Sequence, residues 1–144
     1  MRISRDGTWY HEGAPIRRPA MVRLFSTILR READGNFVLV TPVEKLDIDV
    51  EDAPFVAVEL KTEGEGATGA LAFRLNTGDV IVAGPDHPLT FEVHGDQPRP
   101  LVAVRQGLDA LIGRSVYYEL VEIALAGDGA LWSGGVRFAL EPDR

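Results

Sequence analysis

The chain has 144 residues, carries a net charge of −7, and 45% of its residues are apolar. This length suits one domain or two very small ones, and the acidic balance disfavours binding of duplex nucleic acid through its phosphates. Cysteine is absent, which excludes disulfides, cysteine-ligated metals and thiol nucleophiles. Neither an apolar run long enough for a membrane span nor a signal-peptide core is found, so we expect a cytoplasmic protein.

Basic residues are concentrated near the N-terminus. Residues 1–31 contain seven arginines against two acidic residues, and the rest of the chain is strongly acidic. The densest acidic run comprises Asp47, Asp49, Glu51 and Asp52. This pattern indicates either solvated faces and internal ion pairs, or an anion site and a contact between subunits.

The first part of the chain is predicted to hold one helix among short strands. A strand is expected over residues 8–11, after which Pro19 opens an amphipathic helix. The apolar residues of this helix recur with helical spacing. They are Met21, Leu24, Phe25, Ile28 and Leu29. Strands follow at 37–41 and 46–51, and the second alternates between inward apolar residues and outward acids.

The remainder is predicted to be mostly strands around a second helix. The expected strands are 55–61, 70–75, 80–83, 89–93, 101–105, 108–112, 130–132 and 136–140. A helix is expected over residues 116–126, with Ser115 as its N-cap and Gly127 as its end. Because Glu119 and Glu122 are its only charged residues, we expect this helix to be buried on most sides. The chain is therefore predicted to have an α+β fold.

Gly64, Gly66 and Gly69 spell the G-x-G-x-x-G pattern of dinucleotide-binding loops. That motif requires a helix directly after the loop, whose N-terminus holds the pyrophosphate. Here a strand pattern follows, so we interpret the stretch as a surface loop of a hairpin. It is also the natural boundary between two halves, which we expect at residues 1–62 and 63–144.

No metal site or catalytic nucleophile is evident. The three histidines lack the spacing of metal ligands, and His87, in a loop between Asp86 and Pro88, is the best functional candidate among them. The Trp132–Gly135 stretch permits close backbone approach to a ligand or to another strand. Arg17 and Arg18 precede the first helix and form a weaker candidate anion site.

Seven stretches, in this order along nearly the whole chain, resemble one bacterial family, known as domain of unknown function 1285. The stretches are DGTWY (6–10), LF and LRRE (within 24–32), TPVEK (41–45), EDAPFVA (51–57), GPDHPL (84–89), VYYELV (116–121) and WSGG (132–135). The resemblance implies a cytoplasmic α+β protein with a duplicated core, each half a twisted, mostly antiparallel sheet packed with one helix. It also implies a C-terminal half loosely similar to pleckstrin-homology folds, a nucleotide-like ligand at the junction of the halves and a role in signalling.

We therefore expect a non-catalytic protein that binds a small anionic molecule and needs no cofactor. The expected ligand-binding residues are polar or aromatic groups in loops and near the ends of elements. They are Thr41, Glu44, Lys45, His87, Tyr117, Tyr118, Trp132 and Ser133. Two alternatives stay open: a small enzyme that uses Glu44 and His87 in acid–base chemistry, and a homodimeric interaction module.

Overall fold

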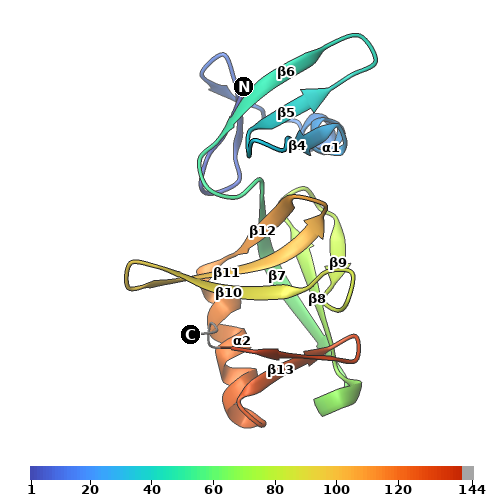
Figure 1. Ribbon diagram of the computed structural model, residues 1–144, viewed down its shortest axis with the longest axis vertical. Coiled ribbons are helices and arrows are strands. Elements are labelled where there is room, and N and C mark those ends of the chain that lie inside the picture. The colour runs from blue at the N-terminus through green and yellow to red at the C-terminus, as the bar shows by residue number, and fades with distance from the viewer. Residues whose placement is uncertain (141–144) are drawn as a thin grey trace.

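The computed structural model describes residues 1–140 and shows two six-stranded sheets stacked end to end, each with one helix (Figure 1). The first sheet has the order β3-β2-β1-β6-β5-β4. Its strands are β1 (Arg2–Ile3), β2 (Trp9–His11), β3 (Ala14–Pro15), β4 (Leu29–Arg31), β5 (Phe37–Val40) and β6 (Lys45–Val50), and its helix is α1 (Pro19–Thr27). All neighbouring strands are antiparallel except β1 and β6.

The core of the first half is built on Trp9, which is buried and stacks on Phe25 of α1 at 6.5 Å between ring centroids. The helix begins at Pro19 as expected, but it ends at Thr27, two residues before the predicted apolar stripe ends. Leu29 instead opens β4 and is fully buried. The apolar spacing typical of a helix extends beyond α1 because Leu29, although it belongs to a strand, packs into the same core.

The second sheet has the order β10-β11-β12-β7-β8-β9 and curls around its own core (Figure 1). Its strands are β7 (Phe55–Glu63), β8 (Ala70–Leu75), β9 (Val80–Val82), β10 (Leu89–His94), β11 (Gln97–Arg105) and β12 (Leu108–Ile112). Helix α2 (Arg114–Ala126) and the hairpin of β13 (Ala130–Ser133) and β14 (Val136–Ala139) follow. The α+β fold with two similar halves is thus confirmed, and β7 places the division between the sheets before residue 55 rather than at 62.

Helix α2 differs from expectation in two ways. It is buried along one face only, through Val116, Leu120 and Ala124, because the sheet covers only that side. Tyr118 and Leu125 are 57% and 76% exposed, so the prediction of burial on most sides is wrong. Its N-cap is Gly113 without a side-chain hydrogen bond, not Ser115, whereas Gly127 ends the helix as expected.

The halves are joined by hydrogen bonds that cross between the sheets. The Asn76 side chain donates to the Gly7 carbonyl and accepts from the Val56 N–H, both at 2.9 Å. Gly7 has φ +89°, and a Cβ there would lie 2.7 Å from Asn76 Nδ2. Only glycine therefore allows this contact. Arg99 adds an ion pair to Asp52 at 2.6 Å, beside the connection between the sheets.

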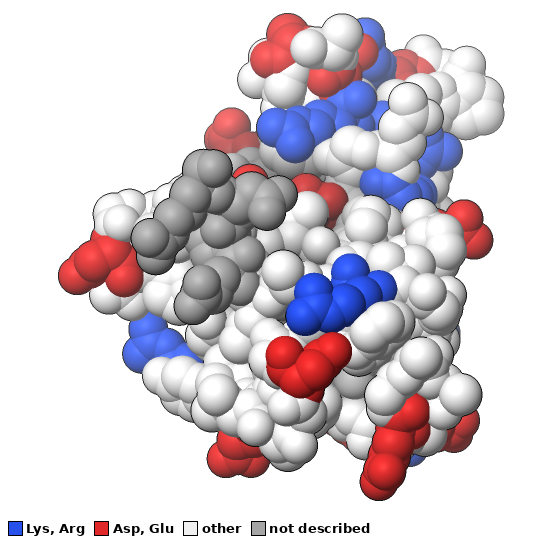
Figure 2. Space-filling model, turned by 60° about the horizontal axis from the view of Figure 1, so that its bottom comes forward, with Lys and Arg blue, Asp and Glu red and all other residues white. Residues whose placement is uncertain are grey.

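Charge is distributed unevenly over the surface. Figure 2 shows many Lys and Arg side chains over the N-terminal half, and groups of Asp and Glu around the lower part of the C-terminal half. The acidic run near residue 50 pairs with Arg2, through Glu51 at 3.7 Å, and with Arg99. Within residues 1–140 it forms no ion pair with Arg23 of α1 or with Arg17 and Arg18, which precede that helix. None of the described helices is long and apolar enough to cross a membrane.

The glycine-rich stretch is a connection between β7 and β8, as the sequence predicted. A single 3-10 turn (Gly66–Thr68) interrupts it, and β8 follows at Ala70. The pyrophosphate-binding helix that a dinucleotide fingerprint requires is therefore missing at this position.

Candidate functional site

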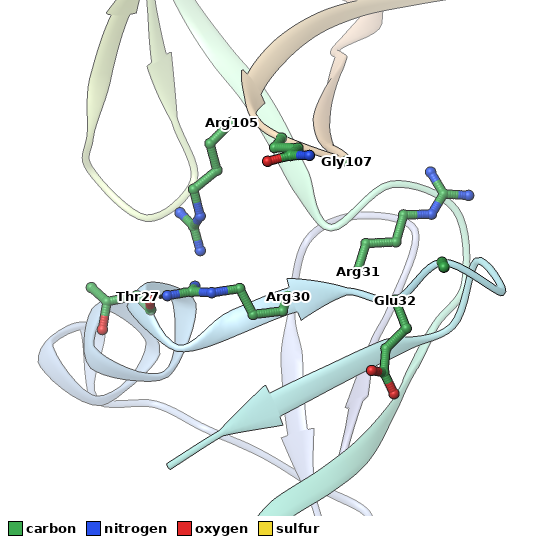
Figure 3. Close-up of a pocket in the computed structure, with 8 residues that line it drawn as sticks. Thr27, Arg30, Arg31, Glu32, Arg105 and Gly107 are labelled. Carbon is green, nitrogen blue, oxygen red and sulfur yellow. Dashed lines mark hydrogen bonds between the residues drawn. The ribbon is translucent and has the colours of Figure 1, made fainter. Parts of the chain in front are cut away.

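An open cleft of about 790 Å³ lies where the two halves meet. It is lined by the end of α1, strand β4 with the turn after it, and the β11–β12 turn (Figure 3). Three of its residues are arginines, of which Arg30 and Arg31 come from the first half and Arg105 from the second. We call this site the arginine cleft.

Arg30 and Arg105 meet at the C-terminal end of α1. Arg30 Nη1 donates to the carbonyls of Thr27 and Leu29 at 3.0 and 2.7 Å. Arg105 Nη2 donates to the carbonyls of Ser26 and, at 3.1 Å, Leu29. The two guanidinium groups therefore share the Leu29 oxygen. Carbonyls at a helix C-terminus carry partial negative charge, which explains why cations from both halves converge there.

The cleft is rich in positive charge, which Asp79 near Arg105 and Asp109 near Arg31 offset only from a distance. Burial and the nearby charge of Arg30 lower the pKa of Arg105, since both disfavour its protonated form. Within the described part of the chain, none of the three arginines forms an ion pair with a carboxylate. A guanidinium group has five N–H donors, so donors beyond those used for the carbonyls remain for a bound anion.

Arg31 and Glu32 point in opposite directions from the end of β4. Arg31 is directed toward the second half (Figure 3), with its Nε 3.3 Å from the Gly35 carbonyl and its guanidinium 5.2 Å from the centroid of the Phe37 ring. Glu32 is directed away and accepts two hydrogen bonds of 3.1 Å from Lys45 Nζ. The one carboxylate at the rim of the arginine cleft is thus already neutralised.

Of the expected site residues in the first half, three lie around the β5–β6 turn. The Thr41 hydroxyl accepts the N–H groups of Val43 and Glu44, which gives the turn its shape. Glu44 is exposed, and Lys45 reaches the cleft only indirectly, through Glu32. Arg17 and Arg18 are exposed before the first turn of α1 and do not line the arginine cleft.

The other expected residues lie in the second half, in several places. His87 Nδ1 is 2.8 Å from the Ala103 carbonyl, and Tyr117 and Tyr118 lie on α2. Trp132 Nε1 donates to Asp128 at 3.2 Å and lines a separate cavity beside the glycine-rich loop. None of the eight expected residues lines the arginine cleft.

Ser133 is fully buried, and its hydroxyl is used within the fold. It accepts the Leu71 N–H at 2.8 Å and donates to the Ala83 carbonyl at 2.7 Å. At the neighbouring Gly134, which has φ +59°, a Cβ would lie 3.0 Å from that same carbonyl oxygen. The sequence of the Trp132–Gly135 stretch allows close approach either to a ligand or to another strand. The structure shows close approach to another backbone segment.

The arginine cleft could not be predicted from the sequence. Its one signal was the basic segment over residues 1–31, which contains Arg30 and Arg31. Arg105 is 74 residues further along the chain and belongs to no motif, so only the fold shows its place. Across residues 1–140, no group of three or more His, Asp or Glu side chains is arranged to hold a metal ion.

The fold and the cleft define a class: a two-domain α+β protein with a basic cleft at the domain junction. Sequence profiles of one family match both domains. The profile described as domain of unknown function (DUF1285), N-terminal domain, matches residues 1–53, and the one described as protein of unknown function (DUF1285), C-terminal domain, matches residues 54–140. The chain belongs to the DUF1285 family.

Two solved structures support this assignment. A DUF1285 family protein from Silicibacter pomeroyi DSS-3 is 49% identical, with a TM-score of 0.89 over 99% of this chain and 79% of that one. A DUF1285 family protein from Shewanella baltica OS155 is 26% identical, with a TM-score of 0.66 over 85% of this chain and 90% of the other. A comparison with curated proteins gives no match.

Proposed function

We propose that the protein is a non-catalytic binding protein whose ligand is a small phosphate-bearing anion held in the arginine cleft. One observation carries the proposal: Arg30, Arg31 and Arg105 line one cleft, and none of them forms an ion pair with a carboxylate among the described residues. Guanidinium groups match phosphate oxygens in geometry and charge. A bound anion would relieve the repulsion between Arg30 and Arg105.

The cleft favours the phosphates of a ligand over a nucleoside part. Its lining among residues 1–140 contains no aromatic side chain on which a base could stack. Tyr117, Tyr118 and Trp132, considered for that role, lie on α2 and β13. We therefore expect pyrophosphate to bind about as well as ADP, and adenosine to bind weakly or not at all.

The position of the cleft supports a role in signalling. Its arginines come from both halves, so a multivalent anion would add a link between the two sheets. Binding would then stabilise one arrangement of the halves, which is how a ligand biases a conformational equilibrium. The enzyme alternative has less support, because Glu44 and His87 lie in loops of different halves and line none of the cavities described here.

Calorimetric titration with pyrophosphate tests the proposal. We expect Arg31→Gln to weaken binding by roughly ten- to a hundredfold, because a charge-assisted hydrogen bond contributes about 1.5–3 kcal/mol. Arg17→Gln removes the same charge from an exposed site outside the cleft and serves as the matched control. Equal losses in the two variants would show a general charge effect, and no binding of pyrophosphate or ADP by the wild type would refute the proposal.

A further inference from the structure

A second hollow lies in the C-terminal half, between α2, β7 and the glycine-rich loop. It consists of two adjoining cavities of about 680 and 340 Å³ that share Thr62, Ile123 and Ala126 in their linings. Together they form one continuous depression along the side of α2, which we call the α2 groove. The arginine cleft shares no residue with it.

The α2 groove is acidic at its rim. Of the residues 1–140 that line it, five are carboxylates and none is lysine or arginine. The carboxylates are Glu63, Glu65, Glu119, Glu122 and Asp128. Asp128 pairs with Arg137 at 3.4 Å, whereas the four glutamates form no ion pair with any described residue. The rim is therefore suited to a positively charged partner.

The groove also has an apolar lining that remains partly exposed. Leu60, Ile123 and Trp132 contribute to it, and Ile123 is 37% exposed. The complementary partner is a basic surface with exposed apolar side chains. Its positive charges would pair with the acidic rim, and its apolar side chains would be buried against the apolar lining of the groove.

The same chain presents such a surface on α1, in its N-terminal half. Helix α1 exposes 62% of Leu24 and 38% of Met21, and Arg17 and Arg18 stand at its N-terminus with no acidic residue in the first turn. Neither arginine forms an ion pair within the part of the chain that the structure describes. Two positive charges at a helix N-terminus destabilise it, so carboxylates from a partner would relieve this repulsion.

We propose that the α2 groove binds the α1 surface of a second copy of this chain. Within one copy α1 lies in the N-terminal half, whereas α2 and the glycine-rich loop lie in the C-terminal half, away from α1 (Figure 1), so the contact is made between molecules. Arg17 and Arg18 would meet Glu119 and Glu122, while Leu24 would enter the apolar lining. Two such contacts in an antiparallel pair give a closed dimer, and a single contact repeated gives an open chain.

Light scattering after size exclusion, at low salt and over about 5 to 500 µM chain, tests this contact. The wild type should rise above its monomer mass of 15.7 kDa with concentration and return to it in high salt. The variant Glu119→Lys/Glu122→Lys and the variant Arg17→Glu/Arg18→Glu should each stay monomeric. Asp86→Lys/Asp96→Lys makes the same charge change in exposed loops outside the groove and should associate like the wild type.

Mixing the two charge-reversed variants supplies the decisive comparison. Their reversed surfaces are complementary to each other, so an equimolar mixture should associate at least tenfold more tightly than either variant alone. The variant Glu119→Gln/Glu122→Gln removes the two negative charges without reversing them and should weaken association. Thermal melting checks that each variant folds. A wild type that stays monomeric, as expected if a different basic protein occupies the groove, or a mixture that stays monomeric, would overturn the proposal.

Discussion

Ser133 ties the β13–β14 hairpin to the second sheet through its side chain. Its buried hydroxyl accepts a hydrogen bond from the Leu71 N–H and donates one to the Ala83 carbonyl. A buried polar group that loses its partner destabilises the folded state by about 1–3 kcal/mol. The hydroxyl therefore stabilises the folded state through two hydrogen bonds.

We predict that Ser133→Ala lowers the free energy of unfolding by about 2–4 kcal/mol, because two buried groups lose their partner together. Denaturant titration measures the change. Ser115→Ala is the control: Ser115 is exposed on α2 and provides no cap, so its loss should cost less than about 0.5 kcal/mol. A neutral Ser133→Ala variant that no longer binds pyrophosphate would instead give Ser133 the ligand-binding role expected from the sequence.

Asp109 is a half-buried carboxylate on β12 whose charge is poorly accommodated. Burial raises its pKa above the ordinary value of 3.8, and the nearby positive charges of Arg31 and Arg99 offset this only in part. Between that ordinary value and the raised folded pKa, the folded chain binds more protons than the unfolded chain. Stability therefore falls as pH rises through this interval, and the ionised group destabilises the fold at neutral pH.

We predict that Asp109→Asn melts at a higher temperature than the wild type at pH 7, because asparagine keeps the shape without the charge. The difference should shrink as pH falls and Asp109 becomes protonated in the folded wild type. Thermal melting across pH measures this, with the exposed Asp86→Asn as the control. A difference that stays constant with pH would show that the effect is not electrostatic.

At the scale of elements, the Lys45–Glu32 ion pair links β6 to β4 across the intervening β5. Both side chains are about half exposed, at 54% and 38%, so the pair contributes less than about 1 kcal/mol to stability. Its main effect concerns the arginine cleft, because Lys45 neutralises the carboxylate at the rim. Lys45 thus supports anion binding without contacting the anion.

We predict that Lys45→Ala weakens pyrophosphate binding by roughly two- to tenfold, since Glu32 is then an uncompensated negative charge near the site. Glu32→Gln should strengthen binding, and the double variant should bind about as well as the wild type. Calorimetric titration of all three variants completes the double-mutant cycle. A double variant as weak as Lys45→Ala alone would mean that Lys45 contacts the ligand directly.

Secondary structure was largely predictable from the sequence because it depends on local patterns. Pro19 at the start of α1 and the alternation along β6 each mark an element by neighbouring residues alone. The end of α1 was not predictable, because Leu29 continues the apolar spacing although it begins a strand. The exposure of α2 was not predictable either. A low number of charged residues in a helix does not indicate how much of its surface is covered by other elements.

At the scale of the whole molecule, the arginine cleft arises from the end-to-end arrangement of two similar halves. The β11–β12 turn of one half faces the end of α1 and β4 of the other, which brings Arg105 beside Arg30, while Arg31 extends to the other side of the same cleft (Figure 3). No sequence pattern encodes that approach, since it depends on how the sheets stack. The family resemblance implied a ligand at the junction, which stays a prediction, and the residues that line the cleft there are evident only from the structure.

The most direct test of the arginine cleft is an NMR titration with pyrophosphate that follows the Nε–Hε signals of the arginine side chains. We predict that the signals of Arg30, Arg31 and Arg105 shift together, with one saturation curve, while those of Arg74 and Arg137, which pair with Glu59 and Asp128, stay in place. The central claim would be contradicted if the three cleft signals stayed unchanged at saturation, or if the shifts were confined to Arg17 and Arg18.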